Sequence, residues 1–523
     1  MKNKKYIIVL SIINVIRSFL LVLQAIYSKY LIDDVTHGRN FLTSAIIFIV
    51  LIGLNIIFNI SYLAIKNRFS LAIEVGMKQE IYNALIKKDY NEAKKFHSGE
   101  ITNIYLSDIQ NIRAGLCETI PGFFLYISRF VLSFLALILL DPFLLIVLIV
   151  VGIVIIVGAK LYGNIIKKYH KRSLESDGRL NAFMQESFEN IKIVKATNSQ
   201  GNFINALDDK LKENYSIKNK RNIISIFGNG GLHILMQSCS AFTMLYGALG
   251  IASGTLSYGD LVGLLQIVSY FESPLSMFSQ LLNRYHTYKV SQERINELLF
   301  LKDEEEQEEI TTFDKIEIKN ITFGFDNTKI YSNYSLTINK NDTILLKGQS
   351  GCGKTTLFNL LLAFEKPTTG SIEVYSNGRI LPISKCRNLF SYVFQENILF
   401  SGTIEENIRL FVPNARDEDI VSALKIACVY DEIMEKPLQL KTELIERGNG
   451  LSIGQIQRIL LAISLLKDNP ILLLDEFTSA LDKELEKQIV INVSNLPKTK
   501  IIITHRDINI DNAKIIYLGD NDE

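Results

Sequence analysis

The sequence predicts an all-α membrane domain of six helices followed by an α/β domain of the P-loop NTPase class. Six apolar segments long enough to cross a bilayer lie within residues 1–300. From Thr312 onward, short β-branched strands alternate with helical segments, which is typical of an α/β domain. A glycine-rich motif between one of these strands and a helix indicates the P-loop class.

The first apolar segment is a retained membrane span by its length and composition. It follows Lys2, Lys4 and Lys5 as a signal peptide would, but its apolar run is too long and Arg17 interrupts it. The six predicted spans are Tyr6–Tyr27, Phe41–Ile65, Ile120–Leu140, Phe143–Ala159, Gly231–Ile251 and Leu261–Leu282.

The loops between the spans predict the orientation. Those after the second and fourth spans are long and rich in Lys and Arg, whereas the opposite loops carry few. Because cytoplasmic loops carry an excess of these residues, we expect both long loops and both termini in the cytoplasm. Helix-like spacing of Ile81, Ala84 and Leu85 predicts that the spans continue into the cytoplasm. The expected protein is a multi-pass protein of the cell membrane, embedded in the lipid bilayer.

The composition excludes several other classes. The chain has 523 residues, is 48% hydrophobic and carries a net charge of +1, so it is neither a strongly basic nucleic-acid binder nor an acidic disordered chain. Its five scattered cysteines form no CxxC pair and predict neither a disulfide framework nor a zinc site. The acidic run Asp303–Glu309 is expected to be solvated, as a linker or an exposed helix end. We therefore divide the chain into a membrane domain (1–300), an acidic linker (301–311) and a nucleotide-binding domain (312–523).

A phosphate-binding loop follows the predicted strand Thr343–Lys347. Gly348–Thr355 fits the pattern GxxxxGK[ST], in which backbone N–H groups and a helix N-terminus surround phosphates. Lys354 is expected to reach the β- and γ-phosphates of ATP, and the Thr355 hydroxyl to bind Mg²⁺. The predicted nucleotide-binding residues of this segment are Gly348, Gln349, Ser350, Gly351, Cys352, Gly353, Lys354, Thr355 and Thr356.

Two further strands end in residues suited to phosphate chemistry. The all-apolar strand after Pro470 ends at Asp475, which suits Mg²⁺ coordination, and Glu476, which can orient or polarise the attacking water. The strand Lys500–Thr504 is followed by His505, whose imidazole could bond a γ-phosphate. These groups predict ATP hydrolysis.

The remaining motifs resemble those of ATP-binding cassette (ABC) transporters. Leu451–Gln455 resembles the LSGGQ signature, Phe394–Glu396 the Q-loop and Ser479–Asp482 the D-loop. Leu399–Ile408 and Thr442–Gly448 resemble stretches typical of the exporter branch. With six spans before one cassette, the whole chain is similar to an exporter half-transporter, which implies an ABC-type cassette with a helical subdomain.

The resemblance also implies roles for individual residues. A dimer would enclose two ATP molecules, each between one subunit's P-loop and Ser452, Gly454 and Gln455 of the other. Gln395 would contact Mg²⁺, sense the attacking water and couple the site to the membrane helices. The second half-transporter could be a second copy or a different chain. Segments Phe96–Ile101 and Ile193–Asn198 would be the coupling helices.

Two positions depart from the family pattern. Ile453 replaces the third signature residue, a glycine, which predicts a perturbed but working signature. Phe325 stands where the family usually has an adenine-stacking tyrosine, and its ring can still stack.

The sequence of the membrane domain indicates the transported solute less clearly than the motifs indicate the nucleotide site. Polar residues fall at helical spacing in the first, fifth and sixth spans, for example Asn14 and Arg17 in the first and Glu272 in the sixth. Such residues usually face a bundle interior or an aqueous path, although hydrogen bonds that only hold the bundle together are an alternative. They predict a polar pathway and suggest an amphipathic or mixed-charge solute such as a peptide.

Three functions fit these observations to different degrees. An exporter driven by ATP hydrolysis fits best. An ATP-gated regulator or channel subunit is disfavoured by Glu476 and His505, and a soluble cassette protein acting on ribosomes or DNA is excluded by the six spans. An importer built on the exporter fold is a further alternative.

Overall fold

The computed structural model describes residues 4–96, 98–325, 328–396, 398–445, 450–506, 508 and 510–519. The chain forms two compact units. The membrane unit comprises Met1–Ala84 and His97–Phe300, and the cassette unit comprises Leu85–Phe96 and Leu301–Glu523.

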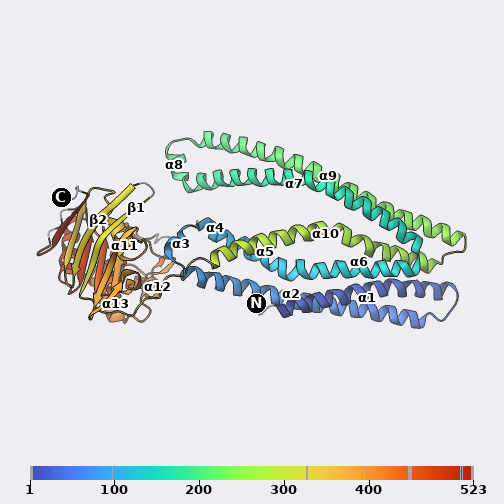
Figure 1. The fold of residues 1–523 in the computed structure, drawn as a ribbon, viewed down its shortest axis with the longest axis horizontal. Coiled ribbons are helices and arrows are strands. Elements are labelled where there is room, and N and C mark those ends of the chain that lie inside the picture. The colour runs from blue at the N-terminus through green and yellow to red at the C-terminus, as the bar shows by residue number, and fades with distance from the viewer. Residues whose placement is uncertain are drawn as a thin grey trace. The chain divides into compact units, whose positions relative to one another are not determined.

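The membrane unit is built from long helices (Figure 1). The six longest stretches are α1 (Lys4–Thr36), α2 (Leu42–Ile86), the run that ends in α6 (Ile120–Leu140), α7 (Pro142–Glu189), α9 (Gln200–Ala252) and α10 (Tyr258–Leu299). Among the described residues, five helical stretches are long and apolar enough to cross a membrane, and the apolar part of α7 is Pro142–Ile155. The predicted spans fall within these helices, except that Phe41 lies one residue before α2.

Several of these helices are much longer than a bilayer is thick. The α2, α7 and α9 helices have 45, 48 and 53 residues. At about 1.5 Å per residue, each extends far beyond the roughly 30 Å hydrocarbon layer. The predicted continuation of the spans beyond the membrane is therefore confirmed.

The run that ends in α6 is not a uniform α-helix. It contains α4 (Ser98–Asn103), α5 (Ile109–Ala114) and two π-helical turns, η1 (Ile104–Asp108) and η2 (Gly115–Thr119). A π-helical turn inserts a residue into the helical repeat and so changes the direction of the side chains around it, often at a functional site.

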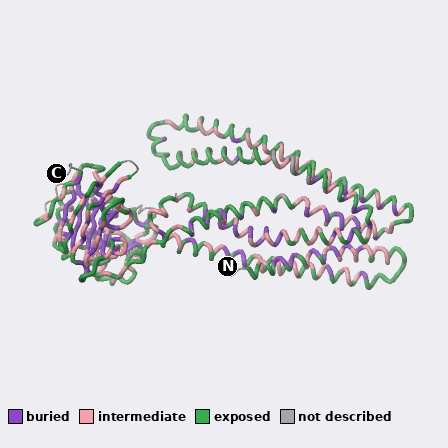
Figure 2. Tube along the Cα trace, viewed as in Figure 1, coloured by how far each residue is buried: buried purple, intermediate pink, exposed green. Residues whose placement is uncertain are grey.

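Packing within the membrane unit leaves large apolar surfaces exposed. Buried side chains gather where α1, α6 and α10 meet, around Ala25, Leu137 and Ile267. Elsewhere these helices carry exposed Ile, Leu and Phe side chains, and Figure 2 shows that most of their surface is exposed or half-buried. Such apolar exposure suits helices whose outer faces contact lipid.

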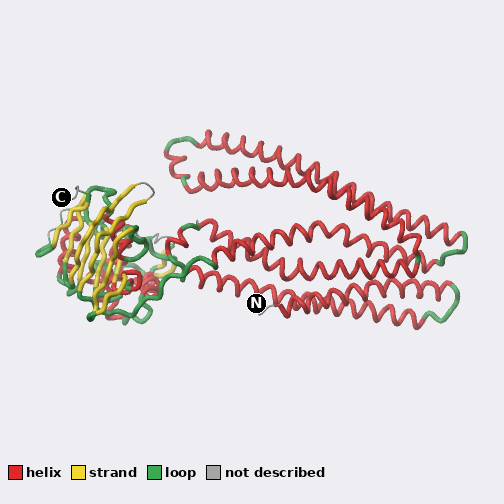
Figure 3. The backbone as a smooth tube through the Cα atoms, viewed as in Figure 1, coloured by secondary structure: helices red, strands yellow, loops and turns green. Residues whose placement is uncertain are grey.

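The described residues of the cassette unit form two larger sheets and a small one, whose strands are yellow in Figure 3. An antiparallel sheet has the order β2-β1-β4-β5, and a parallel sheet has the order β11-β3-β10-β9-β6. The strands are β1 (Lys315–Phe325), β2 (Thr328–Asn339), β3 (Thr343–Gly348), β4 (Thr369–Ser376), β5 (Arg379–Pro382), β6 (Phe390–Val393), β9 (Ile471–Asp475), β10 (Thr499–Ile503) and β11 (Lys514–Leu518), with β7 (Gly402–Thr403) and β8 (Glu443–Leu444) in the small sheet.

Helices bury the parallel sheet on both faces, which explains the apolar composition of β9 and β10, each of whose residues is buried. One core joins the antiparallel sheet to the parallel sheet and includes residues of α11, and the other lies among α13, α15 and α16. The cassette helices are α11 (Lys354–Leu361), α12 (Ile404–Phe411), α13 (Asp417–Ile426), α14 (Tyr430–Met434), α15 (Ile453–Leu466) and α16 (Lys483–Ser494).

A short helix from the first long loop belongs to the cassette unit. It is α3 (Tyr90–Lys94), whose Tyr90 ring lies 4.8 Å from that of Phe364, while Asp89 accepts a 3.0 Å hydrogen bond from Lys366. The first coupling helix was expected at Phe96–Ile101, but the segment that contacts cassette residues lies a few residues earlier. His97, within the expected segment, falls outside the described residues. In the second loop, α8 (Ile191–Ala196) coincides with most of the expected Ile193–Asn198.

The acidic run is attached to the cassette by ion pairs. Asp303 bonds Lys88 at 2.6 Å, Glu304 pairs with Arg387, and Glu308 lies 3.9 Å from Lys385. Three of its carboxylates thus pair with cations of the cassette unit, while most of the run is exposed, as a solvated run would be.

Candidate nucleotide site

The phosphate-binding loop connects β3 to α11, as its motif predicts. Gly351 and Gly353 have φ angles of +85° and +100°, a left-handed conformation that favours glycine. A Cβ atom at Gly353 would overlap the Ile330 side chain, and the Gly353 carbonyl accepts a 2.8 Å hydrogen bond from Tyr331. These positions therefore fix a tight turn whose N–H groups can surround phosphates.

Lys354 begins helix α11 at the base of the loop and is only 6% exposed. Its ammonium donates hydrogen bonds to the carbonyls of Gly348 at 2.8 Å and Gln349 at 2.9 Å. The buried lysine is thereby held beside the loop that would bind the β- and γ-phosphates. Gln349 and Ser350 are exposed, and Cys352 and Thr356 are half-buried.

Thr355 and Asp475 form the pair of oxygen donors predicted for Mg²⁺. The Thr355 hydroxyl donates to the Asp475 carboxylate at 3.1 Å, and the Tyr392 hydroxyl reaches the same carboxylate oxygen at 3.4 Å. Burial raises the pKa of Asp475, and the neighbouring Glu476 raises it further. Hard oxygen ligands at the phosphate end of the loop fit a Mg²⁺ ion.

Glu476 and His505 lie side by side at the carboxyl ends of adjacent parallel strands. Their Oε1 and Nε2 atoms are 3.3 Å apart. Glu476 has a φ of +48°, and its N–H donates to the carbonyl of Ile503 at 3.0 Å. This backbone conformation turns the chain at the strand end, where strained residues are often functional.

The signature segment caps the N-terminus of α15. The Ser452 hydroxyl accepts from the Gln455 N–H at 3.2 Å, and the Gln455 side chain accepts from the Ser452 N–H at 3.0 Å, which forms a capping box. The side-chain Nε2 of Gln455 also donates a 2.8 Å hydrogen bond to the Glu432 carboxylate. The Gln455 side chain is thus engaged within its own subunit. Ile453, by contrast, is 63% exposed.

Two further predicted residues lie at the ends of strands. Gln395 follows β6 and is exposed, while Phe325 ends β1 with its ring 5.1 Å from that of Phe323. In the described part of the chain, no hydrogen bond joins the signature residues to the P-loop. Glu446, Arg447 and Gly448 of the exporter-like stretch Thr442–Gly448 lie outside the described residues.

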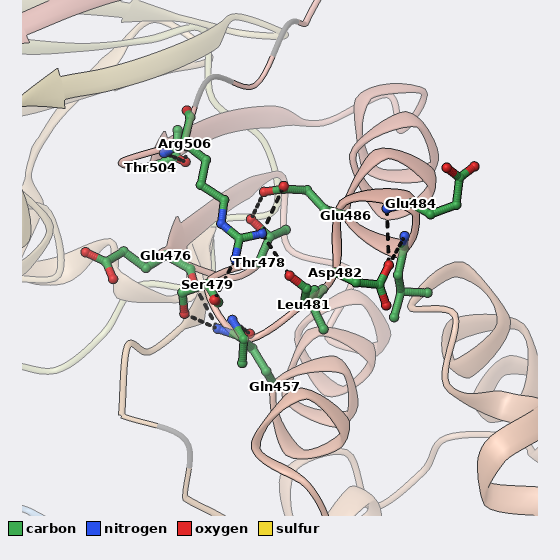
Figure 4. Close-up of polar contacts among 12 residues, drawn as sticks. Gln457, Glu476, Thr478, Ser479, Leu481, Asp482, Glu484, Glu486, Thr504 and Arg506 are labelled. Carbon is green, nitrogen blue, oxygen red and sulfur yellow. Dashed lines mark hydrogen bonds and ion pairs between the residues drawn. The ribbon is translucent and has the colours of Figure 1, made fainter.

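Two residues that contact the segments next to Glu476 and His505 were missed by the sequence reasoning. Gln457, 1% exposed, donates to the Glu476 carbonyl at 2.8 Å, and its side-chain oxygen accepts from the Ala480 N–H at 3.4 Å (Figure 4). Arg506 donates to the carbonyls of Ser479 and Leu481, each at 2.9 Å. A polar residue on the buried face of an apolar helix was the available signal for Gln457.

These contacts join the parts of the site. Gln457 connects α15 to the segment after β9. Arg506, which follows His505 at the end of β10, connects that strand end to the turn before α16. In Figure 4, Arg506 reaches across to Glu486, which also accepts a 2.7 Å hydrogen bond from Thr478. The phosphate loop, the paired carboxylates and the histidine define a P-loop ATPase fused to a helical membrane domain.

Comparisons with known proteins identify the family. Residues 7–275 match the family model described as ABC transporter transmembrane region, and residues 331–479 match the one described as ABC transporter. The chain belongs to the ABC transporter family.

Individual relatives agree with this assignment. The chain is 31% identical to an export ATP-binding/permease protein of Rickettsia felis over 85% of this chain and 79% of that one. It is 30% identical to the lactococcin-A transport/processing ATP-binding protein LcnC of Lactococcus lactis over 81% of this chain and 61% of that one. A solved ATP-bound bacterial Atm1-family ABC exporter has the same fold, with a TM-score of 0.83, 22% identity and coverage of 98% and 93%.

These findings confirm the predicted fold class and function. The protein is a multi-pass exporter half-transporter that couples ATP hydrolysis to transport, acts as a dimer in the membrane and holds its nucleotide-binding domain in the cytoplasm.

Proposed function

We propose that a second copy of this chain is the partner and that each of the two ATP sites combines one P-loop with the opposite signature. The chain carries residues that such a site needs, among them Lys354, Glu476 and His505. Its signature is capped by Ser452 and Gln455, and the Ile453 side chain points to solvent instead of disturbing the cap. The backbone N–H groups of this helix N-terminus suit a γ-phosphate.

Mg²⁺ would be held by oxygen atoms of the Thr355 hydroxyl, the Asp475 carboxylate and the Gln395 side chain. The 3.1 Å contact between Thr355 and Asp475 supports this assignment. The bound ion would neutralise charge on the β- and γ-phosphate oxygens.

Hydrolysis would be directed by Glu476. Its carboxylate would accept a proton from the attacking water, whose oxygen bonds to the γ-phosphorus as the bond to the ADP oxygen breaks. His505, 3.3 Å from Glu476, would orient that carboxylate and bond a γ-phosphate oxygen. Lys354 would neutralise the charge that develops on the phosphates.

The cargo in this proposal is a peptide-like or amphipathic solute. Its support is the presence of polar and charged side chains inside the membrane unit, together with a relative named for lactococcin-A transport. The membrane domain (1–300), linker (301–311) and cassette (312–523) remain the proposed functional division.

The pair of Glu476 and His505 beside the P-loop is the observation that carries this proposal. The test is to purify the chain alone in lipid nanodiscs, and to measure its mass and its ATPase rate with Mg²⁺ and with EDTA. We expect a dimer that hydrolyses ATP only with Mg²⁺, and a Lys354→Ala variant that loses ATP affinity. A monomer or an inactive dimer would contradict the second-copy proposal, and Mg²⁺-independent turnover would contradict the metal assignment.

A further inference from the structure

A cavity of about 310 Å³ lies within the membrane unit, among α1, α2, α10 and the run that ends in α6. Its size is that of a site for a small ligand or for one end of a larger one. Its polar lining comes from Asn14, Arg17, Tyr62, Glu118, Gln280 and Arg284. The cavity is therefore charged although it lies between apolar helices.

Arg17 is incompletely paired in this cavity. Its Nη1 donates to the Asn14 side chain at 3.1 Å, and its guanidinium carbon lies 5.3 Å from the centre of the Tyr62 ring. Its Nε is buried and has no hydrogen-bond partner, and among the described side chains no carboxylate lies within 4.0 Å of it. A guanidinium inside a membrane helix is costly unless an anion or a polar group compensates it.

The carboxylate in the cavity is shared between two cations. Glu118 lies 3.4 Å from the Lys66 amine and 3.7 Å from Arg284. Arg17 and Arg284 line the cavity together with Glu118, and Lys66 contacts Glu118, so three cations stand against one carboxylate and leave an excess of two positive charges. Both contacts to Glu118 are long for charge-assisted hydrogen bonds, so a ligand carboxylate can compete for these cations.

A π-helical turn positions Glu118 in this arrangement. Glu118 lies in η2, which begins at Gly115. The Tyr288 ring of α10 packs so closely against Gly115 that no Cβ atom would fit there. This close approach sets Glu118 against the helix that also carries Arg284, one turn before Tyr288.

We propose that this cavity binds a carboxylate of the transported solute, so that the exported substrates are organic acids or peptides with a free carboxylate. Arg17 and Arg284 would donate the hydrogen bonds, because guanidinium groups bind carboxylates through paired N–H donors. Tyr62 and Tyr126 would contact the apolar part of the solute. This substrate class rests on the export function and narrows the proposed peptide-like cargo to an acidic one.

The chain contains no tryptophan, so a single tryptophan can report binding. Tyr126→Trp places one on the cavity wall, and Met277→Trp gives a second reporter on another helix. The probe is N-acetyl-Leu-Leu-Asp with free carboxylates, compared with its diamide, added to the protein in phosphatidylcholine nanodiscs. We expect the acid to bind at least about tenfold more tightly than the diamide.

Charge variants then separate recognition from structure. Arg17→Gln or Arg284→Gln should raise the Kd of the acid about tenfold and leave the Kd of the diamide unchanged. Arg17→Lys keeps the positive charge and should raise the Kd of the acid by a smaller factor. Glu118→Gln should tighten binding of the acid, since a competing carboxylate is removed. Arg179→Gln breaks a pair with Glu213 that lies outside the cavity, and it should change neither Kd.

The proposal would be overturned if both tryptophan variants gave the same Kd for the acid and the diamide. It would also be overturned if Glu118→Gln raised the Kd of the acid. Nanodiscs that contain phosphatidylglycerol test whether a lipid phosphate fills the cavity, and loss of the acid signal in these nanodiscs would also overturn the proposal.

ATPase turnover measured on the same nanodiscs distinguishes failure of the proposed substrate class from failure of the proposed function. Normal turnover without acid preference rejects only the substrate class, whereas absent turnover with acid preference rejects the ATP-driven mechanism and keeps the site.

Discussion

The side-chain amide of Gln457 donates a 2.8 Å hydrogen bond to the backbone carbonyl of Glu476. Gln457 lies on the helix that follows the signature, and Glu476 is the carboxylate proposed to direct hydrolysis. The same amide reaches the Ser479 hydroxyl at 3.4 Å. These contacts tie the signature helix directly to the backbone of Glu476 and to the turn that follows it.

Gln457→Leu should lower ATP turnover about tenfold and keep ATP affinity, because Glu476 loses its support while the P-loop is untouched. The Glu476 carbonyl would keep the 3.0 Å hydrogen bond from the Ser479 N–H but lose the one from Gln457, and the loss of one hydrogen bond costs about 0.5–1.5 kcal/mol of unfolding free energy. ATPase rates, equilibrium ATP binding and denaturant unfolding check these expectations. Gln488→Leu on the exposed face of α16 is the control and should change little. Wild-type turnover in Gln457→Leu would show that this contact has no catalytic consequence.

Glu476→Gln should reduce turnover at least about 100-fold, the usual contribution of a general base. ATP binding should persist, since Lys354 and the P-loop remain, and the dimer should accumulate in its closed, ATP-bound form. Single-turnover hydrolysis and retention of labelled ATP measure these two effects. Glu484→Gln, an exposed glutamate on α16, should behave as wild type. Turnover within a few-fold of wild type in Glu476→Gln would reject this carboxylate as the base.

Two glycines with positive φ angles provide a matched test of the P-loop geometry. Gly353→Ala should abolish ATP binding, because its Cβ would meet Ile330 and its φ of +100° strains any side chain. Gly378 has a φ of +75° but open space around it. Gly378→Ala should therefore cost only the backbone strain, roughly 1–3 kcal/mol, and leave ATP affinity unchanged. Equal ATP affinities in the two variants would contradict the importance of the close packing at Gly353.

Glu432 should make the cassette sensitive to acid. Burial alone would raise its pKa, but hydrogen bonds from Arg458 and Gln455 outweigh burial and hold the pKa of Glu432 below its usual 4.5. Because the folded pKa is lowered, the stabilisation is present above pH 4.5 and is lost as the pH falls through the lowered value.

Glu432→Gln should consequently lower the melting temperature at pH 7, and the difference from wild type should shrink as the pH falls below 4.5. Thermal unfolding of both proteins across this pH range measures the difference in melting temperature. Glu435→Gln, on a neighbouring residue with no contact to the signature helix among the described side chains, is the control. A difference that stays constant with pH would show that the Glu432 charge does not stabilise the fold.

Ile453→Gly should raise turnover, since Ile453 is 63% exposed at the start of α15 and its side chain would face the ATP held by the partner subunit. Loss of the side chain leaves the capping box intact, so stability should fall by no more than about 1 kcal/mol. Ile453→Ala should give an intermediate rate. ATPase assays of the three proteins rank them, and an unchanged or reduced rate in Ile453→Gly would show that this residue does not limit closure around ATP.

The elements that the sequence predicts well are those with strong local patterns. Strands β3, β9 and β10 follow from short apolar runs, and the P-loop from glycines and Lys354 at fixed spacing. The pairing of Glu476 with His505 was also foreseeable, because residues that end adjacent parallel strands meet at one edge. The contacts of Gln457, Arg506 and Glu432 were not, since each joins segments about 20 or more residues apart whose approach depends on packing.

The sequence by itself therefore determined the order of the domains, the membrane spans and the chemistry of the nucleotide site. These depend on hydropathy and on motifs that act within one strand, loop or helix. Only the tertiary structure decided that α3 joins the cassette unit, that η2 brings Glu118 to Arg284, and that Arg17 lies in a charged cavity. The physical reason is that the position of a side chain between helices depends on how closely their backbones approach, as Gly115 against Tyr288 shows, and no local pattern encodes that distance.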